Sequence, residues 1–154
     1  VFARGNRKDP AAAAAPGIHD NFTAVVGWAD GAYGVISQSL SAVEHHLSVK
    51  AFGSAGVLRS EWHAEMDRSE QPRYSLEISE GGAMKPLPVE TTPGELFELR
   101  AEIRAMAAAV ERGAPDSGAP LPFTLEEARR AVALCVAAER SMEIGAPVPV
   151  GSGQ

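Results

Sequence analysis

Four acidic and imidazole side chains at alternate positions are the first candidates for chemistry in this chain. Glu61, His63, Glu65 and Asp67 are each two residues apart, which is typical of the polar face of one β-strand. Carboxylate oxygens and imidazole nitrogens are common ligands of divalent metals. Ligands at i, i+2 and i+4 of one strand are about 6–7 Å apart, so three of them do not converge easily on one ion. We therefore expect a solvated polar face and no metal site.

The other candidate residues are isolated in the sequence. His45 and His46 open a predicted strand, so their side chains point to opposite faces, and a buried or interface role is favoured over metal binding. His19 lies in a loop before a predicted hairpin, where it could contact a small-molecule substrate. Cys135 lies among Ala, Val and Leu on a predicted helix and is expected to be a buried, inert thiol. We assign no catalytic and no cofactor-binding residue.

A β-hairpin over residues 21–40 is the clearest structural signal. Asp30 and Gly31 separate two runs of β-forming residues, and an Asp-Gly pair in this position predicts a two-residue turn. That turn would place Val26 opposite Val35 and Trp28 opposite Tyr33 on one surface.

Both surfaces of the predicted hairpin lack charged residues. Two helices can cover only one of them, so the other is expected to contact a partner. We predict that the surface of Val26, Trp28, Tyr33 and Val35 forms the interface of a homo-oligomer, with the aromatic residues as anchors.

The remaining elements follow the order strands first, helices last. Further strands are predicted over residues 1–7, 47–52, 57–67, 73–79 and 85–89. Capping boxes at Thr92 and Thr124 predict two helices, which end near Gly113 and Gly145. Both helices carry apolar stripes. This order predicts an α+β fold, an open, mostly antiparallel β-sheet with two C-terminal helices packed on one face, as one domain over residues 1–154.

Composition limits the class of protein. With 45% hydrophobic and 22% charged residues, the chain has the make-up of a globular domain. Its net charge of −6 argues against a nucleic-acid partner. No run approaches the ~20 apolar residues of a membrane span. A single cysteine fits a reducing cytoplasm. Val1 begins what looks like the middle of a strand, so we expect the chain to be a fragment.

Three segments in order resemble a known family. They are the hairpin from Asp20-Asn21-Phe22 to Tyr33-Gly34, the turn Gly53-Ser-Ala-Gly56 within residues 49–58, and the final segment from Phe123-Thr-Leu-Glu-Glu to Ile144-Gly-Ala-Pro-Val148. Together, over residues 18–150, they resemble the C-terminal domain of the Gfo/Idh/MocA oxidoreductases.

The resemblance implies a parent enzyme that transfers hydride between NAD or NADP and a sugar, inositol or related hydroxy compound. The family's G-x-G-x-x-G fingerprint and Glu-Lys-Pro motif are absent from this sequence, and its Asp-x-x-x-His motif would precede residue 1. Lys85-Pro86 matches the last two residues of the Glu-Lys-Pro motif, but Met84 stands where the motif has glutamate. We therefore interpret Lys85 as a surface residue. The resemblance thus implies a missing N-terminal Rossmann domain. This chain would bind no cofactor, would be inactive alone, and would supply a wall of the substrate pocket and the dimer surface.

Two alternatives remain open. The chain could be a free-standing, non-catalytic module for small-ligand binding or dimerisation. A self-contained hydrolase would need a convergent acid–base pair, which the sequence does not reveal.

Overall fold

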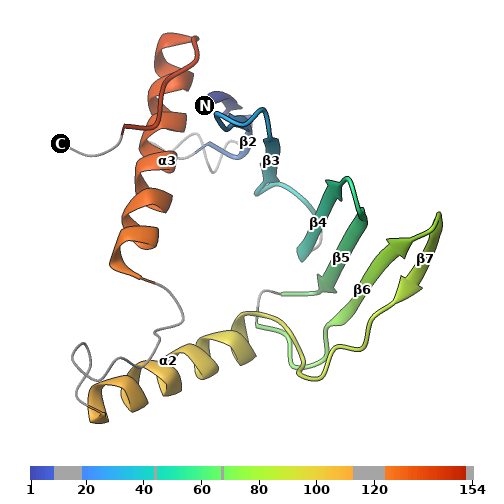
Figure 1. Ribbon diagram of the computed structural model, residues 1–154. Helices are drawn as coiled ribbons and strands as arrows, with labels where there is room; N and C mark the ends of the chain where they lie inside the picture. The colour runs from blue at the N-terminus through green and yellow to red at the C-terminus, as the bar shows by residue number, and fades with distance from the viewer. Residues whose placement is uncertain (9–18, 44, 67, 113–123, 152–154) are drawn as a thin grey trace. The chain divides into compact units, whose positions relative to one another are not determined.

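The described residues of the computed structural model are 1–8, 19–43, 45–66, 68–112 and 124–151. They fall into two compact units. Unit 1 comprises Val1–Ala42 with Phe123–Gln154, and unit 2 comprises Val43–Pro122. Each unit has its own antiparallel sheet and its own helix (Figure 1). The predicted α+β class with antiparallel strands is confirmed.

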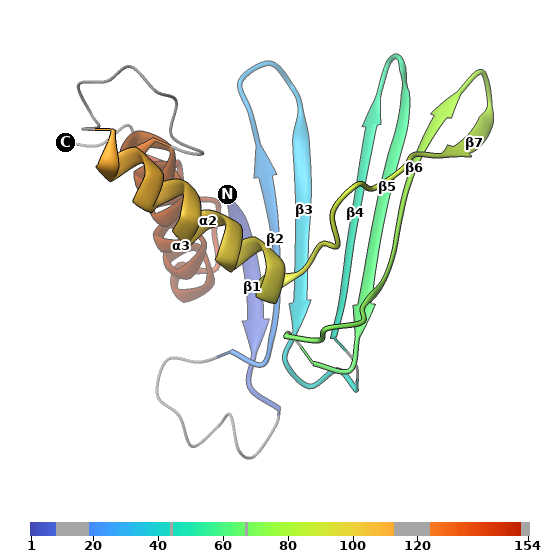
Figure 2. The same cartoon turned by 90° about the horizontal axis from the view of Figure 1, so that it is seen from below.

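Unit 1 is a three-stranded antiparallel sheet in the order β1-β2-β3 (Figure 2). Its elements are β1 (Phe2–Asn6), β2 (Asn21–Gly27), β3 (Tyr33–Ser39) and α3 (Leu125–Ile144). Helix α3 packs against β1. The core is small because the side chains at the contact are alanines, namely Ala3, Ala24 and Ala138, which lets the helix approach the sheet closely.

The predicted two-residue turn of the hairpin is wrong. Trp28 and Ala32 pair instead, through a Trp28 N–H that donates to Ala32 O at 2.9 Å, which leaves a three-residue loop. Gly31 has a φ of 89°, and no described residue other than glycine has a positive φ, so the loop fits a type I turn followed by a left-handed glycine. The Asp30 carboxylate accepts from the Ala32 N–H at 3.0 Å and stabilises this longer loop.

The longer loop shifts the pairing of β2 and β3 by one residue. Val26 lies opposite Gly34 and Val25 opposite Val35. Because facing residues of paired strands share a side of the sheet, Val26 and Val35 lie on opposite sides. The predicted single surface of Val26, Trp28, Tyr33 and Val35 is therefore divided between the two faces.

Helix α3 begins and ends where the sequence predicts. The Thr124 hydroxyl accepts from the Glu127 N–H at 3.1 Å, and the Glu127 carboxylate accepts from the Thr124 N–H at 2.7 Å. Gly145, with φ 67°, caps the C-terminus. The apolar face predicted for α3, which runs from Leu125 to Met142, is buried only in part. Ala138 is buried, together with Ala137 and Ser141, and Met142 packs against the core. Leu125, Val132 and Cys135, which belong to the same predicted face, are exposed.

Unit 2 is a four-stranded antiparallel sheet in the order β4-β5-β6-β7. Its strands are β4 (His45–Gly53), β5 (Gly56–Ala64), β6 (Arg73–Glu80) and β7 (Ala83–Pro86). Gly53 pairs with Gly56, so β4 and β5 are joined by a two-residue loop. Trp62 is the buried aromatic of this sheet, at 8% exposure.

Helix α2 (Glu95–Glu111) begins later than predicted. The expected cap at Thr92 is wrong: the N-cap is Gly94, which has no side chain, and its N–H donates to the Glu98 carboxylate at 3.0 Å. The Trp62 indole N–H donates to Pro93 O at 3.2 Å, which holds this segment against the sheet ahead of the helix. Most of the apolar stripe of α2 is exposed, at Leu99, Ile103, Met106 and Val110. No helix in the described ranges is long and apolar enough to cross a membrane.

Candidate functional site

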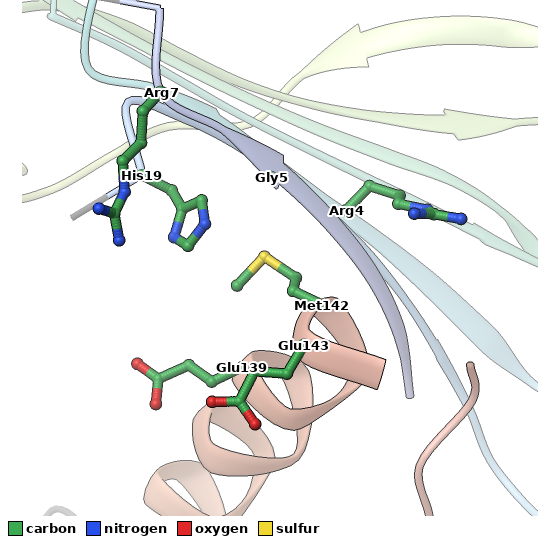
Figure 3. A pocket seen from close by; sticks show the side chains of 7 residues that line it. All are labelled: Arg4, Gly5, Arg7, His19, Glu139, Met142 and Glu143. Atoms are coloured by element: carbon green, nitrogen blue, oxygen red, sulfur yellow. The ribbon is translucent and has the colours of Figure 1, made fainter. Parts of the chain in front are cut away.

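A pocket of about 360 Å³ lies between the end of β1 and helix α3 in unit 1 (Figure 3). Its lining residues are Arg4, Gly5, Arg7, His19, Glu139, Met142 and Glu143. The volume is within the range of small-molecule sites. His19, the residue predicted from the sequence to face a substrate, is one of them, and the other six were not anticipated.

Gly5 is the floor of this pocket. A Cβ atom at Gly5 would come within 2.7 Å of Met142 Sδ and 2.9 Å of His19 Cδ2. The imidazole ring and the thioether therefore both lie directly over the bare backbone of β1. A side chain at this position would displace Met142 or the His19 ring from where they lie.

Arginine and histidine side chains line one side of the pocket and glutamates line the other. Arg7 and His19 come from the strand side, whereas Glu139 and Glu143 come from α3, with the Met142 thioether between them (Figure 3). The Arg4 side chain points away, and its guanidinium lies 5.5 Å from the centre of the Phe2 ring. Donors on one side and carboxylate acceptors on the other suit a small ligand with several hydroxyl groups.

Asp20 fixes the chain next to His19. It is 1% exposed, and its Oδ2 accepts from the Lys8 N–H at 2.8 Å. Its carbonyl accepts from the Leu40 N–H at 2.7 Å. These contacts join the segment before β2 to the ends of β1 and β3. They therefore restrict the position of His19, which precedes Asp20 in the chain.

A second cluster of polar side chains lies in unit 2. His46 on β4 is the direct cross-strand partner of His63 on β5, and Glu61 is two residues away from His63 on the same face. The two imidazole rings stack, with centroids 4.0 Å apart and planes 14° apart. His46 Nε2 and Glu61 Oε2 are hydrogen-bonded at 2.7 Å. We call His46, Glu61 and His63 the His–Glu–His cluster.

The hydrogen bond from His46 lowers the pKa of the Glu61 carboxyl below its ordinary value, and a second bond from Ser48 and the nearby charge of Lys50 act in the same direction. Partial desolvation opposes this effect. These contacts favour the carboxylate form of Glu61.

The sequence pattern did not anticipate the cluster because one member comes from a neighbouring strand. The signal was present in Gly53-Ser-Ala-Gly56, since a two-residue loop there sets His46 opposite His63. Glu65 lies beyond the end of β5 and is exposed, and Asp67 is outside the described residues. His45 is exposed on β4. Lys85 on β7 forms an ion pair with Glu80 at 3.5 Å, as fits a surface lysine.

The predicted interface residues differ in exposure. Val26 is 6% exposed, so it belongs to the interior of unit 1. Trp28 shares its face and lies over Gly34, where an added Cβ would be 3.6 Å from the indole ring. Tyr33 and Val35, on the other face, are 75% and 60% exposed.

Cys135 is exposed, which contradicts the buried thiol expected from the sequence, because α3 turns its alanines and not this side chain toward β1. No protein-family model, curated protein or solved structure matches the chain.

Proposed function

We propose that this chain is the substrate-binding and assembly part of a cytoplasmic nicotinamide-dependent oxidoreductase that acts on a sugar, inositol or related hydroxy compound. In this proposal NAD or NADP binds to a separate Rossmann domain. The observation that supports it most directly is the pocket over Gly5, where His19 and two carboxylates from α3 surround a small polar space.

The chemistry of this pocket favours a neutral polyol. Hydroxyl groups both donate and accept, so they can bond at once to Arg7 and His19 on one side and to Glu139 and Glu143 on the other. Glu143 is oriented by Arg140, whose Nη1 donates to its carboxylate at 2.9 Å. In the parent enzyme these residues would hold the substrate while the nicotinamide supplies the hydride chemistry.

The open face of the unit 1 sheet fits the assembly role. Phe2 on β1 lies opposite Val25 on β2, and Val25 lies opposite Val35 on β3. The three residues therefore form one apolar row across the sheet. Val25 and Val35 are 41% and 60% exposed. We propose that this row, with Tyr33, meets the same row of a second copy; Val26 and Trp28 lie on the other face.

Ligand titration tests the pocket. Calorimetric titration of the purified chain with myo-inositol and with hexoses is expected to show saturable binding of at least one of them. His19→Ala and Glu139→Gln should each weaken that binding about tenfold, which is the loss expected for a hydrogen bond to a polar ligand. His45→Gln, an exposed histidine of unit 2, is the control and should leave binding unchanged. Equal affinities in all variants, or no polyol binding at all, would contradict the pocket assignment.

A second measurement separates the oxidoreductase from a free-standing small-ligand module, which the same pocket would also serve. The coding region upstream of Val1 should encode a G-x-G-x-x-G fingerprint, and the protein expressed with that region should reduce NAD or NADP with the bound polyol. Polyol binding without any nicotinamide turnover would favour the module.

A further inference from the structure

The strand pairing in unit 2 brings together three side chains that are typical metal ligands. His46 and His63 face each other across β4 and β5, and Glu61 precedes His63 on the same side. The coordinating atoms of the three residues all lie within 4.8 Å of one another. A two-histidine, one-carboxylate set is a recurrent way of holding a transition metal with positions left open for other ligands.

We propose that His46, Glu61 and His63 bind one divalent transition-metal ion with zinc-like ligand preferences. Tetrahedral zinc, with bonds of about 2.0–2.1 Å, needs ligand atoms roughly 3.4 Å apart. His46 Nε2 and Glu61 Oε2 are already closer than this, at 2.7 Å. Binding of the ion would require the two rings to rotate out of their stacked arrangement, and the His46 side chain, which is 38% exposed, has room to do so.

The surroundings of Glu61 support this assignment. Ser48 Oγ donates to Glu61 Oε1 at 3.1 Å and leaves Oε2 directed at His46. A hydrogen bond to the second oxygen of a ligating carboxylate is a regular feature of metal sites, because it fixes the direction of the carboxylate. An ordinary solvated strand face does not require this orientation.

The charges around the cluster indicate what else would bind. Arg73 on β6 is the cross-strand partner of His63, and Lys50 acts electrostatically on Glu61. A divalent ion held by one carboxylate leaves a net positive centre beside these two cations. An anion, such as hydroxide or a small carboxylate, is therefore the expected ligand at the solvent-facing position.

Metal titration of the purified full chain tests the proposal. After treatment with a chelator, the chain should bind one Zn²⁺ in competition with a chromophoric chelator, and Co²⁺ should give visible absorption bands of a low-symmetry site. Glu61→Gln and His63→Asn should each lower Zn²⁺ affinity at least about tenfold and remove the Co²⁺ bands. Ser48→Ala should lower the affinity by about tenfold while keeping the bands.

His45→Gln is the matched control, because it replaces the adjacent histidine, which lies on the opposite face of β4. This variant should bind Zn²⁺ as tightly as the unsubstituted chain does. Glu61→Gln preserves size, and far-ultraviolet circular dichroism of each metal-free variant verifies folding. The proposal is overturned if the unsubstituted chain binds no Zn²⁺, or if the Glu61 and His63 variants bind it as tightly as His45→Gln. The cluster and the polyol pocket share no residue, so the experiments can contradict one of the two proposals and leave the other standing.

Discussion

The Ser141 hydroxyl accepts a hydrogen bond of 2.9 Å from the Ala3 N–H, and both residues are completely buried. The same hydroxyl donates to Ala146 O at 2.8 Å. One side chain thus connects helix α3 to the edge strand β1 and to the segment that follows the helix. The Val1 and Val148 backbones then pair next to it, with hydrogen bonds of 2.7 and 2.8 Å.

Replacing this hydroxyl is expected to destabilise unit 1. Ser141→Ala leaves the buried Ala3 N–H and the half-buried Ala146 carbonyl without their partner, which costs about 1–3 kcal/mol. Urea unfolding followed by circular dichroism measures the change. Ser37→Ala, an exposed serine of β3, should change stability by less than about 0.5 kcal/mol. Similar small changes in both variants would refute the structural role of Ser141.

A side chain at Gly5 is expected to close the pocket. Gly5→Ala pushes against Met142 and His19, so it should cost about 1–3 kcal/mol through overpacking and should weaken polyol binding. Gly27→Ala is the control, because a Cβ at Gly27 meets nothing within 4 Å. Calorimetry and urea unfolding of both variants test this; unchanged ligand affinity in Gly5→Ala would place the binding site elsewhere.

The N-terminus of α3 is expected to weaken in acid. Hydrogen bonds from the Thr124 N–H and hydroxyl lower the pKa of Glu127, and ion pairs with Arg129 and Arg130 lower that of Glu126 to about 2. Because these pKa values are lower in the folded chain, their stabilisation is present above the ordinary value of 4.5 and is lost as pH falls below it. Glu127→Ala should therefore destabilise the chain more at pH 7 than at pH 3. Urea unfolding at both pH values is the measurement, with Glu102→Ala of α2 for comparison. An equal effect of Glu127→Ala at both pH values would show that the charge does not contribute.

Substitution of the two tryptophans is expected to change stability by different amounts. Trp62→Phe removes the hydrogen bond to Pro93 O and the packing on Gly94, which should cost about 1–3 kcal/mol and speed amide exchange at the start of α2. Trp28 is 57% exposed, so Trp28→Phe should change stability by less than about 0.5 kcal/mol. Equal losses in both variants would mean that Trp62 does not anchor α2.

Assembly through the open sheet face is tested by two adjacent residues of β3. Val35 lies on the proposed interface and Ile36 on the opposite face, and both are about half exposed, at 60% and 49%. If two copies associate through the apolar row, Val35→Lys should shift the sedimenting species from dimer to monomer, whereas Ile36→Lys should leave it dimeric. A monomeric unsubstituted chain would contradict the proposed assembly.

Local sequence determined most of the elements of this protein. Alternation predicted the strands, and the Thr124 capping box with Gly145 located α3, because these signals act between residues a few positions apart. The same locality explains the failures. Asp30-Gly31 indicates a turn but does not by itself distinguish a two-residue from a three-residue loop, and one extra residue moved Val26 and Val35 to opposite faces.

Only the tertiary structure decided which residues meet. Ala138 and Met142 of α3 pack against Ala3 and Ala24, whereas Leu125 and Val132 of the same helix are exposed. His19 and Met142 both lie against Gly5, which has no side chain, and His46 joins Glu61 and His63 only through strand pairing. Contacts between residues distant in sequence depend on register and packing, and a single residue of slip changes both.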